Sequence, residues 1–344
     1  MSLLDNITDD YITSPSGKRY TNNNNIPLLT ARMYILAHEN GYKGTGSTVI
    51  DGKPKISVTT LIGIPKQYLY SQKYPDLNPI RDVSSFAASA RGTIFHNALE
   101  KSIKEWGDTS VESETRVQRD FAGYAIEWVL DGEWDVFEDR MIKDLKTTSN
   151  WKLAEFLKEK KAIETKDLLN TEYSISEAKE KYPVYFSYVL QLSIYKWLRR
   201  EGNEKDEGAI IFMLTNGGGH QRLPVDTEIS IPLIPKDKLE KWMQDRLGLL
   251  KNHLDNDTLP ECTPSERMQT EGQWKLQRIS KKGDKYITVK NTTSNYYEGF
   301  KSLTANLHVN TTKHNPDKIV VKEPQNLMCD VYCDYKDICE QNNT

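Results

Sequence analysis

Residues 132–147 read GEWDVFEDRMIKDLKT, and this stretch decides the fold that we expect. The residues on either side of Glu138-Asp139 predict two short strands that form a hairpin. Asp144 and Lys146 are two positions apart, so on a strand their side chains project from the same face. Asp135 lies nine residues before Asp144, on the partner strand. The hairpin can therefore bring both carboxylates together beside one lysine.

This set of side chains suits the hydrolysis of a phosphodiester. Two carboxylates can hold a hard divalent cation such as Mg²⁺ through oxygen. The cation polarises a phosphoryl oxygen and activates a bound water, while a lysine orients that water or offsets developing charge. A tripeptide of the type Asp-x-Lys also occurs by chance on solvated strands. The alternative interpretation of Asp144 and Lys146 is therefore a surface ion pair that contributes little stability.

Two further motifs flank this hairpin. Residues 91–100 read RGTIFHNALE, and residues 191–195 read QLSIY. In this order, and together with the Gly-x-x-Asp and Ile-x-Asp-Leu-Lys-Thr segments of 132–147, they resemble the RecB-like branch of the PD-(D/E)XK nucleases over about residues 56–209. That branch includes the RecB and AddB nuclease domains, the CRISPR-adaptation nuclease and many phage exonucleases. The resemblance implies a metal-dependent exonuclease on single-stranded or end-containing DNA, in phage recombination and repair.

The resemblance also implies roles for individual residues. The catalytic residues would be Asp135, Asp144, Lys146, Gln191 and Tyr195, and the metal ligands would be His96, Asp135, Asp144 and Leu145. The metal would be Mg²⁺ or Mn²⁺, and an imidazole ligand favours Mn²⁺ somewhat. From the residues alone, His96 and Glu100 are one helical turn apart and equally fit an ordinary helix pair.

The four cysteines all lie in the last part of the chain, at Cys262, Cys329, Cys333 and Cys339. Free cysteines packed as small hydrophobes are one alternative, but the last three lie in a polar tail that offers little core. Four thiolates suit Zn²⁺ or an iron–sulfur cluster. A C-terminal triplet with one distant cysteine resembles the iron–sulfur centre of AddB and the CRISPR-adaptation nuclease, which favours [4Fe–4S] over Zn²⁺. In those proteins, however, the solitary cysteine precedes the nuclease core, whereas Cys262 follows it.

We expect an α/β fold with a central mixed β-sheet flanked by helices, like the restriction-endonuclease core, and a C-terminal cysteine-ligated subdomain. The expected parts are an N-terminal lead-in over residues 1–55, the nuclease core over 56–259 and the cysteine-containing subdomain over 260–344. Within the lead-in, we expect residues 1–30 to be flexible or loosely packed and residues 30–40 to form a short helix. Periodicity predicts helices near 84–106 and 184–200. Residues 56–62 fit a strand, or a strand running into a helix that is capped at Thr59 or Thr60.

Composition restricts the class of protein. The chain has 344 residues, 37% of them hydrophobic and 28% charged, with a net charge of −3, which is typical of a globular protein. Because the balance is slightly acidic, contacts to DNA must come from local patches. The first residues do not read as a signal peptide, and no run of about 18 apolar residues predicts a membrane span. We therefore expect a cytoplasmic protein with DNA as its partner, and recombination or replication proteins as further candidates.

Two alternatives remain open at this point. One is a restriction-type endonuclease of the same fold. The other belongs to a different class, a nucleic-acid-binding module whose nuclease site is vestigial, and the complete set of Asp135, Asp144 and Lys146 argues against it. The phosphate-binding pattern G-x-x-x-x-G-K-[ST] does not occur, so no built-in helicase motor is expected.

Overall fold

A computed structural model of the chain describes residues 7–8, 11–41, 49–50, 52–75, 77, 80–107, 110–123, 126–164, 174–215, 226–270, 273–279, 286–292, 318–322 and 325–339. The chain divides into two compact units, Met1–Glu261 and Cys262–Thr344. Each unit has its own sheets and is described by itself.

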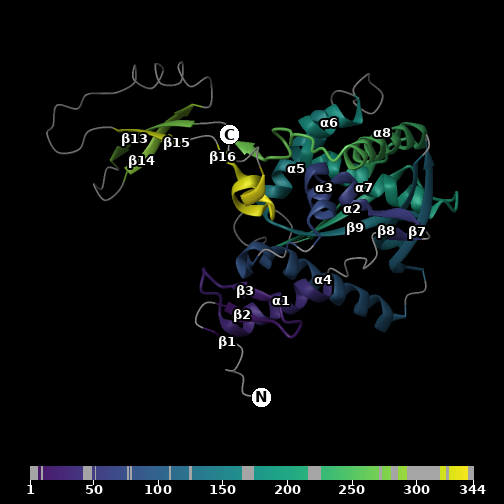
Figure 1. Ribbon diagram of the computed structural model, residues 1–344, viewed down its shortest axis with the longest axis horizontal. Coiled ribbons are helices and arrows are strands. Elements are labelled where there is room, and N and C mark those ends of the chain that lie inside the picture. The colour runs from purple at the N-terminus through teal and green to yellow at the C-terminus, as the bar shows by residue number, and fades with distance from the viewer. Residues whose placement is uncertain are drawn as a thin grey trace. The chain divides into compact units, whose positions relative to one another are not determined.

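The first unit is built around a mixed sheet of seven strands (Figure 1). The strands are β4 (Val49–Ile50), β5 (Lys53–Ser57), β7 (Glu112–Gly123), β8 (Ile126–Glu138), β9 (Met141–Thr148), β10 (Glu207–Leu214) and β11 (Asp226–Pro232). Their order is β11-β10-β9-β8-β5-β4, with β7 also paired to β8. β9 is parallel to β10, and β5 is parallel to β8. The expected α/β fold with a mixed sheet flanked by helices is confirmed.

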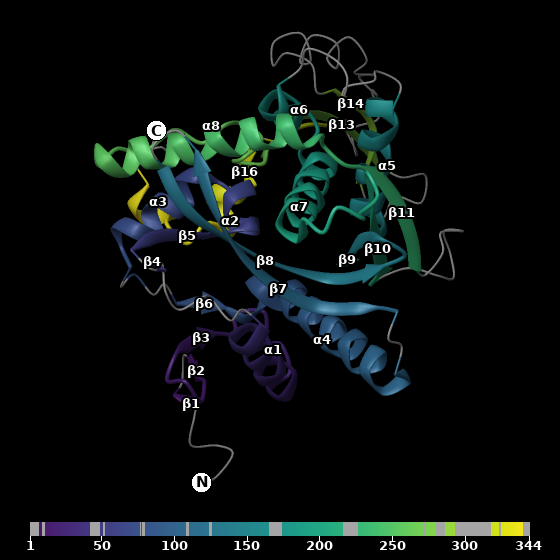
Figure 2. The same cartoon turned by 90° about the vertical axis from the view of Figure 1, so that its right-hand side faces the viewer.

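Helices cover both faces of this sheet. Figure 2 shows α4 (Val83–Trp106) and α7 (Pro183–Arg199) on opposite sides of β8 and β9. The other helices near the sheet are α2 (Val58–Ile62), α3 (Pro65–Lys73), α5 (Asn150–Glu164), α6 (Ile175–Lys181) and α8 (Lys236–Asp255). Nearly every residue of α7 is buried, so its polar side chains must find partners inside the protein. Among the described helices, none is long and apolar enough to cross a bilayer.

The junction between β5 and α2 lines one side of the site described below. Ser57 keeps extended dihedral angles (φ −76°, ψ 155°), and its hydroxyl accepts a hydrogen bond from the backbone N–H of Thr60 at 3.1 Å. Ser57 is therefore the N-cap, and the prediction of a cap at Thr59 or Thr60 is wrong by two or three positions. The strand continues to Ser57 because Ile56 is still buried in the sheet's core.

Helix α7 lies closest to the sheet at Gly132. A Cβ atom at this position would overlap Leu198 Cδ1 and lie 3.1 Å from Tyr195 Cε1. We expect Gly132→Ala to lower the free energy of unfolding by about 1–3 kcal/mol, because the close packing has no room for a methyl group. As a control, Gly248→Ala should raise it by about 0.5–1 kcal/mol, since α8 gains helix propensity and the new Cβ meets nothing within 4 Å. Urea unfolding of both variants tests this, and equal effects at the two sites would contradict it.

The N-terminal residues form a small layer of their own. Strands β1 (Ile7–Thr8), β2 (Tyr11–Thr13), β3 (Arg19–Thr21) and β6 (Arg81–Asp82) make a four-stranded sheet beside α1 (Leu28–Gly41). Their core contains Tyr20, Ile35 and Phe86, and Glu39 accepts hydrogen bonds from Ser14, Ser16 and Tyr20. The expected loose packing is therefore wrong for residues 11–30, whereas the helix expected over 30–40 is present as α1. The short strands escaped prediction because they complete their pairing with β6, far along the chain.

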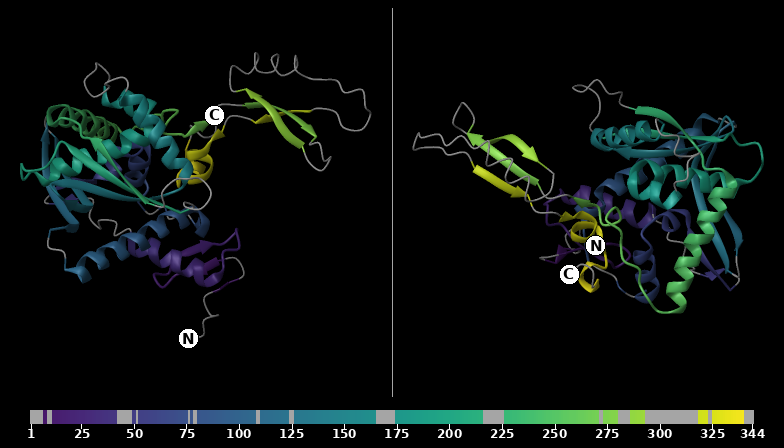
Figure 3. Two further views of the ribbon diagram at one scale, coloured as in Figure 1. Left: turned by 180° about the vertical axis from the view of Figure 1, so that it is seen from behind. Right: turned by 90° about the horizontal axis from the view of Figure 1, so that it is seen from above.

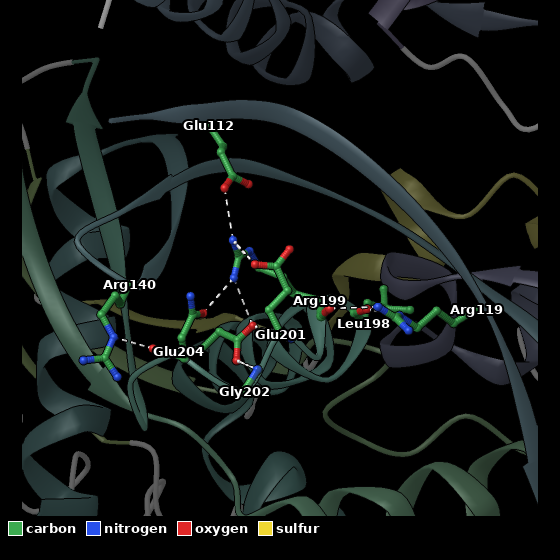
Figure 4. A network of polar contacts seen from close by, with 9 residues as sticks. Glu112, Arg119, Arg140, Leu198, Arg199, Glu201, Gly202 and Glu204 are labelled. Carbon is green, nitrogen blue, oxygen red and sulfur yellow. Dashed lines mark hydrogen bonds and ion pairs between the residues drawn. The ribbon is translucent and has the colours of Figure 1, made fainter. Parts of the chain in front are cut away.

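The end of α7 is held by a buried arginine (Figure 4). The guanidinium of Arg199, whose side chain is 4% exposed, forms ion pairs with Glu112 at 3.0 Å, Glu201 at 2.8 Å and Glu204 at 3.1 Å. Glu112 is on β7, while the other two carboxylates follow α7. The Arg119 side chain adds a hydrogen bond of 2.8 Å to the Arg199 carbonyl. These contacts anchor α7 about one helical turn beyond Tyr195.

The second unit contains a three-stranded antiparallel sheet, visible in Figure 3. β13 (Gln273–Ile279) pairs with β14 (Tyr286–Thr292) and β15 (Lys318–Lys322). β12 (Gln269–Thr270) pairs with β16 (Gln325–Asn326), which precedes a π-helical turn at Met328–Tyr332 and a 3-10 turn at Lys336–Ile338. The hairpin expected over 274–289 is present as β13 and β14, and its expected turn at 281–284 lies outside the described residues.

Candidate active site

The site lies where two strands separate along one edge of β8. Residues 129–131 of β8 pair with β5, and residues 136–138 pair with β9, whereas β7 pairs along the other edge. The interval between them contains Gly132 and Asp135. A cavity of about 890 Å³ opens there and is lined by residues of β5, β8, β9 and α4, and by Tyr195 of α7.

Both oxygens of Asp135 have partners. The backbone N–H of Leu145 donates a hydrogen bond to Asp135 Oδ2 at 2.6 Å, and His96 Nδ1 lies 3.2 Å from Oδ1. His96 reaches this point because α4 packs tightly against β9. A Cβ at Gly92, one turn before His96, would lie 3.1 Å from Thr147 Oγ1. The helix motif and the strand motif therefore meet at Asp135.

The second carboxylate, Asp144, is 2% exposed and contacts residues of both β9 and α7. Lys146 Nζ lies 2.6 Å from Asp144 Oδ2, and the amide of Gln191 donates to Asp144 Oδ1 at 3.3 Å. The same amide donates to the Tyr195 hydroxyl at 3.0 Å. The alternative of a solvated surface ion pair between Asp144 and Lys146 is therefore wrong.

Burial dominates the electrostatics of these groups. It raises the pKa of Asp144 to about 7, with Lys146 opposing the shift and Asp135 adding to it. Burial alone would also raise the pKa of Asp135, but the hydrogen bond and charge of His96 outweigh it and the pKa falls. For Lys146, burial acts to lower the pKa, but the charges of Asp144 and Asp135 raise it well above its ordinary value. Lys146 is therefore a cation at neutral pH and cannot serve as a base.

The carboxylates, chiefly Asp135, favour the charged form of His96. Burial lowers the pKa of His96, but the hydrogen bond to Asp135 and the charge of Asp135 reverse this, and the net pKa is raised. His96 and Lys146 thus each compensate one carboxylate. A divalent cation could take over that compensation, because it would bring two positive charges to the same oxygens.

The donor set fits a hard divalent cation. Asp144 Oδ2 is buried and, apart from its ion pair with Lys146, accepts no hydrogen bond of good geometry. Two carboxylates and one imidazole are ligand types that Mg²⁺ or Mn²⁺ accepts. Within the described part of the chain, no three His, Cys, Asp or Glu side chains already surround a common point that could hold an ion. Binding would therefore require His96 and Lys146 to shift from their present contacts.

Several residues near this site were not singled out from the sequence. The Tyr188 ring lies 5.9 Å from Lys146 Nζ, and the tyrosine is one helical turn before Gln191 on α7. Lys55, Arg116 and Asp131 line the same cavity. Spacing within α7 could have suggested Tyr188, but the other three lie on three different strands and no local pattern joins them. Glu100 forms an ion pair with Lys104.

The C-terminal cysteines lie within electrostatic range of one another. Burial raises the pKa of the Cys329 thiol, and the charges of Cys333 and Cys339 raise it further. The backbone N–H of Met328 donates to the carbonyl of Arg267 at 3.0 Å, which joins this segment to the one that follows Cys262. Among the described residues, the thiols do not surround a common point that could hold a metal ion. Ligation of one centre by all four cysteines remains a prediction.

Comparison with known proteins adds little to this geometry. No family model matches the chain, and no match is found among curated proteins. Among solved structures, one titled "Crystal structure of SSO0001" is similar over 64% of this chain and 86% of that chain, with 17% sequence identity and a TM-score of 0.41. A likeness of this size carries no argument about function.

Proposed function

We propose that the protein is a metal-dependent nuclease that hydrolyses phosphodiester bonds in DNA. The observation that carries the proposal is the clustering of four side chains from two strands and a helix. His96, Asp135 and Lys146 line one cavity, and Asp144 lies buried behind it in an ion pair with Lys146. Isolated carboxylates on a surface would not need this burial. A buried and a partly buried carboxylate beside a lysine whose pKa is raised suit a reaction in which negative charge builds on a phosphoryl group.

Each residue has a distinct part in this reaction. Asp135, Asp144, His96 and the carbonyl of Leu145 would hold the cation. When bound, Mg²⁺ or Mn²⁺ supplies Lewis-acid polarisation of the phosphoryl group and lowers the pKa of the attacking water. Lys146 stays charged and stabilises the negative charge that develops on the phosphate, or orients the water. Gln191 and Tyr195 position Asp144 through their hydrogen-bonded chain and offer polar contacts to the substrate.

The charges of the cavity explain why activity should depend on the metal. The side chains of Lys55, Arg116 and Lys146 line it, with His96 as a fourth cation when protonated, and they face four carboxylates, Glu100, Asp131, Glu133 and Asp135. Without a metal ion the carboxylates offset these cations, and the cavity offers a phosphodiester no net positive charge. A divalent cation reverses the balance, so EDTA should abolish both productive binding and cleavage.

The experiment is a digestion of end-labelled DNA. We expect Mg²⁺- or Mn²⁺-dependent release of short products from linear single-stranded or end-containing DNA, with closed-circular DNA intact, as for an exonuclease of phage recombination in a cytoplasmic setting. Cleavage of closed circles would instead indicate the restriction-type endonuclease. RNA substrates of the same sequence test whether the protein prefers deoxyribose or ribose. Binding of DNA without any metal-dependent cleavage would favour a vestigial site and reject the proposal.

The choice of metal depends on His96. If its imidazole is a ligand, Mn²⁺ should support at least as much cleavage as Mg²⁺, because Mg²⁺ prefers oxygen ligands. We expect His96→Ala to weaken Mn²⁺ binding about tenfold or more, measured by calorimetry on the metal-free protein. His253→Ala is the control, since His253 of α8 forms a hydrogen bond with the Thr258 hydroxyl beyond the end of the helix and does not line the cavity. An unchanged Mn²⁺ affinity in His96→Ala would leave His96 as a structural partner of Asp135.

We further propose that Cys262, Cys329, Cys333 and Cys339 ligate one [4Fe–4S] cluster, with Zn²⁺ as the alternative. The effect of the Cys333 and Cys339 charges on the pKa of Cys329 and the pairing of β12 with β16 support it. The proposed cluster would have a structural role and take no part in hydrolysis, because none of the four cysteines lines the cavity.

A further inference from the structure

The end of the cavity formed by β5 carries a second group of charged residues. Arg116 donates to both oxygens of Asp131, at 2.9 Å and 2.6 Å, and Gln118 donates to the same carboxylate at 3.4 Å. Lys55 Nζ lies 4.0 Å from Asp131 Oδ2. These residues come from the three neighbouring strands β5, β8 and β7. Arg116 and Gln118 thus supply the hydrogen bonds of Asp131, and Lys55 has only a longer ion pair with this carboxylate.

Lys55 is buried without a close partner. Its side chain is 6% exposed, and within the described residues its ammonium has the 4.0 Å ion pair with Asp131 but no hydrogen bond. A distance of 4.0 Å is too long for a hydrogen bond. The donors of Lys55 are thus left to whatever occupies the cavity, whereas the polar groups of buried side chains are normally paired or hydrogen-bonded within the protein. Because Lys55 lines the cavity, a ligand that enters the cavity can supply the missing acceptors.

The missing ligand is an anion. Lys55 and Arg116 present only donors, so they cannot hold a metal ion. The adjacent hydroxyls of Ser57, Thr59 and Thr60 also line the cavity, and the Ser57 hydroxyl contacts those of Thr59 at 3.1 Å and Thr60 at 2.8 Å. Lysine, arginine and hydroxyl groups are the side chains that contact nucleic-acid phosphates.

This group is separate from the hydrolytic centre. Asp131 and Asp135 are four residues apart on β8, which corresponds to about 13 Å along an extended strand. One phosphate cannot reach both places. If the scissile phosphate lies at Asp135 and Lys146, the phosphate at Lys55 belongs to another part of the same strand.

We propose that Lys55, assisted by Arg116 and the Ser57–Thr60 hydroxyls, binds a second phosphate of the substrate strand, at one defined distance from the scissile bond. The proposal rests on the nuclease function proposed above and adds that the DNA strand is held at one fixed position relative to the cleavage site. The phosphate is either the monoester at a strand end or an internal diester, since both offer the same anionic oxygens. Fixing one such phosphate would set how far from an end the chain is cut.

The test is a phosphate scan with matched lysine variants. Each labelled single-stranded oligonucleotide carries one neutral methylphosphonate, placed at a different position in each, and the set is made with and without a terminal phosphate. The Kd of each is measured with Ca²⁺ in place of Mg²⁺, and gels check that the DNA stays intact. Lys55→Met removes the charge at nearly constant volume. Lys53→Met is the control, because Lys53 is on the same strand but already pairs with Asp120 at 2.8 Å and Glu127 at 3.4 Å and does not line the cavity.

We expect the methylphosphonate at one position, or loss of the terminal phosphate, to weaken DNA binding by the native protein about tenfold. The same change in the DNA should have little further effect on binding by Lys55→Met. Lys55→Met should also reduce the slope of log Kd against log salt by about 0.7, the share of one phosphate on a single strand, whereas Lys53→Met should not. A terminal-phosphate effect identifies the monoester, and an effect at an inner position identifies the diester.

The outcomes separate this proposal from the nuclease function itself. If the native protein cuts DNA but no single phosphate depends on Lys55, the second phosphate site does not exist. If the native protein neither binds nor cuts DNA, the proposed function fails first. If Lys55→Met does not fold, Lys55→Arg, which keeps the charge, replaces it. The scan on the native protein then decides, because equal effects at all phosphate positions overturn the proposal.

Discussion

Asp144→Asn is expected to reduce metal-dependent DNA cleavage by about a thousandfold or more, which corresponds to about 4 kcal/mol of lost transition-state stabilisation. Asp144 is the most buried of the charged residues at the site, and Lys146 and Gln191 both contact it. Asparagine keeps the shape of the neutral carboxyl but offers one neutral oxygen, so the cation loses a charged ligand. The rate of single-turnover cleavage of end-labelled DNA measures the effect.

The fold should survive this substitution. Burial already raises the pKa of Asp144 to about 7, so near neutral pH the protein tolerates an uncharged side chain at this position. Thermal unfolding checks this independently of activity. Asp206→Asn is the matched control, because Asp206 is an exposed aspartate whose partner is Lys196 at 2.6 Å, and it should cut DNA like the native protein. Near-native cleavage by Asp144→Asn would place the chemistry elsewhere.

Cys333→Ala is expected to remove the proposed cluster and loosen the whole second unit. The native protein, purified without oxygen, should be brown and contain iron and acid-labile sulfide, and the variant should be colourless. Structural metal centres contribute on the order of 10 kcal/mol to small domains, comparable to the total stability of many domains. Closing the long loop between Cys262 and Cys329 adds to this by restricting the unfolded chain. Protease sensitivity after about Pro260 measures the loosening.

The controls for this experiment are chosen within the same segment. Tyr332→Phe lies beside Cys333 and changes one exposed side chain, so it should keep colour and protease resistance. Both variants should retain DNA cleavage per folded molecule, since no cysteine lines the active-site cavity. A colourless protein with one zinc per chain would replace the iron–sulfur assignment by Zn²⁺. A metal-free protein of equal stability would remove both.

Much of the local structure could be read from the residues in order. The hairpin follows from alternating apolar residues around Asp139 and Arg140, which both adopt positive φ angles (52° and 64°) in the tight turn. The long helices α4, α7 and α8 follow from periodicity within single segments. The shared face of Asp144 and Lys146 follows from the period of a strand. These features depend on neighbours a few residues apart, so the sequence determines them directly.

Only the tertiary structure decided how these segments meet. The fork of β5 and β9 along β8 places Asp131 and Asp135 on one cavity, and α7 brings Gln191 to Asp144 across 47 positions of the chain. Likewise, the N-terminal strands are ordered by pairing with β6 rather than by their own residues. Pairings over such separations depend on which buried surfaces fit together and on where the chain can turn. The period and spacing of the residues do not encode such pairings, so the weakly paired ammonium of Lys55 in the cavity is visible only in the folded structure.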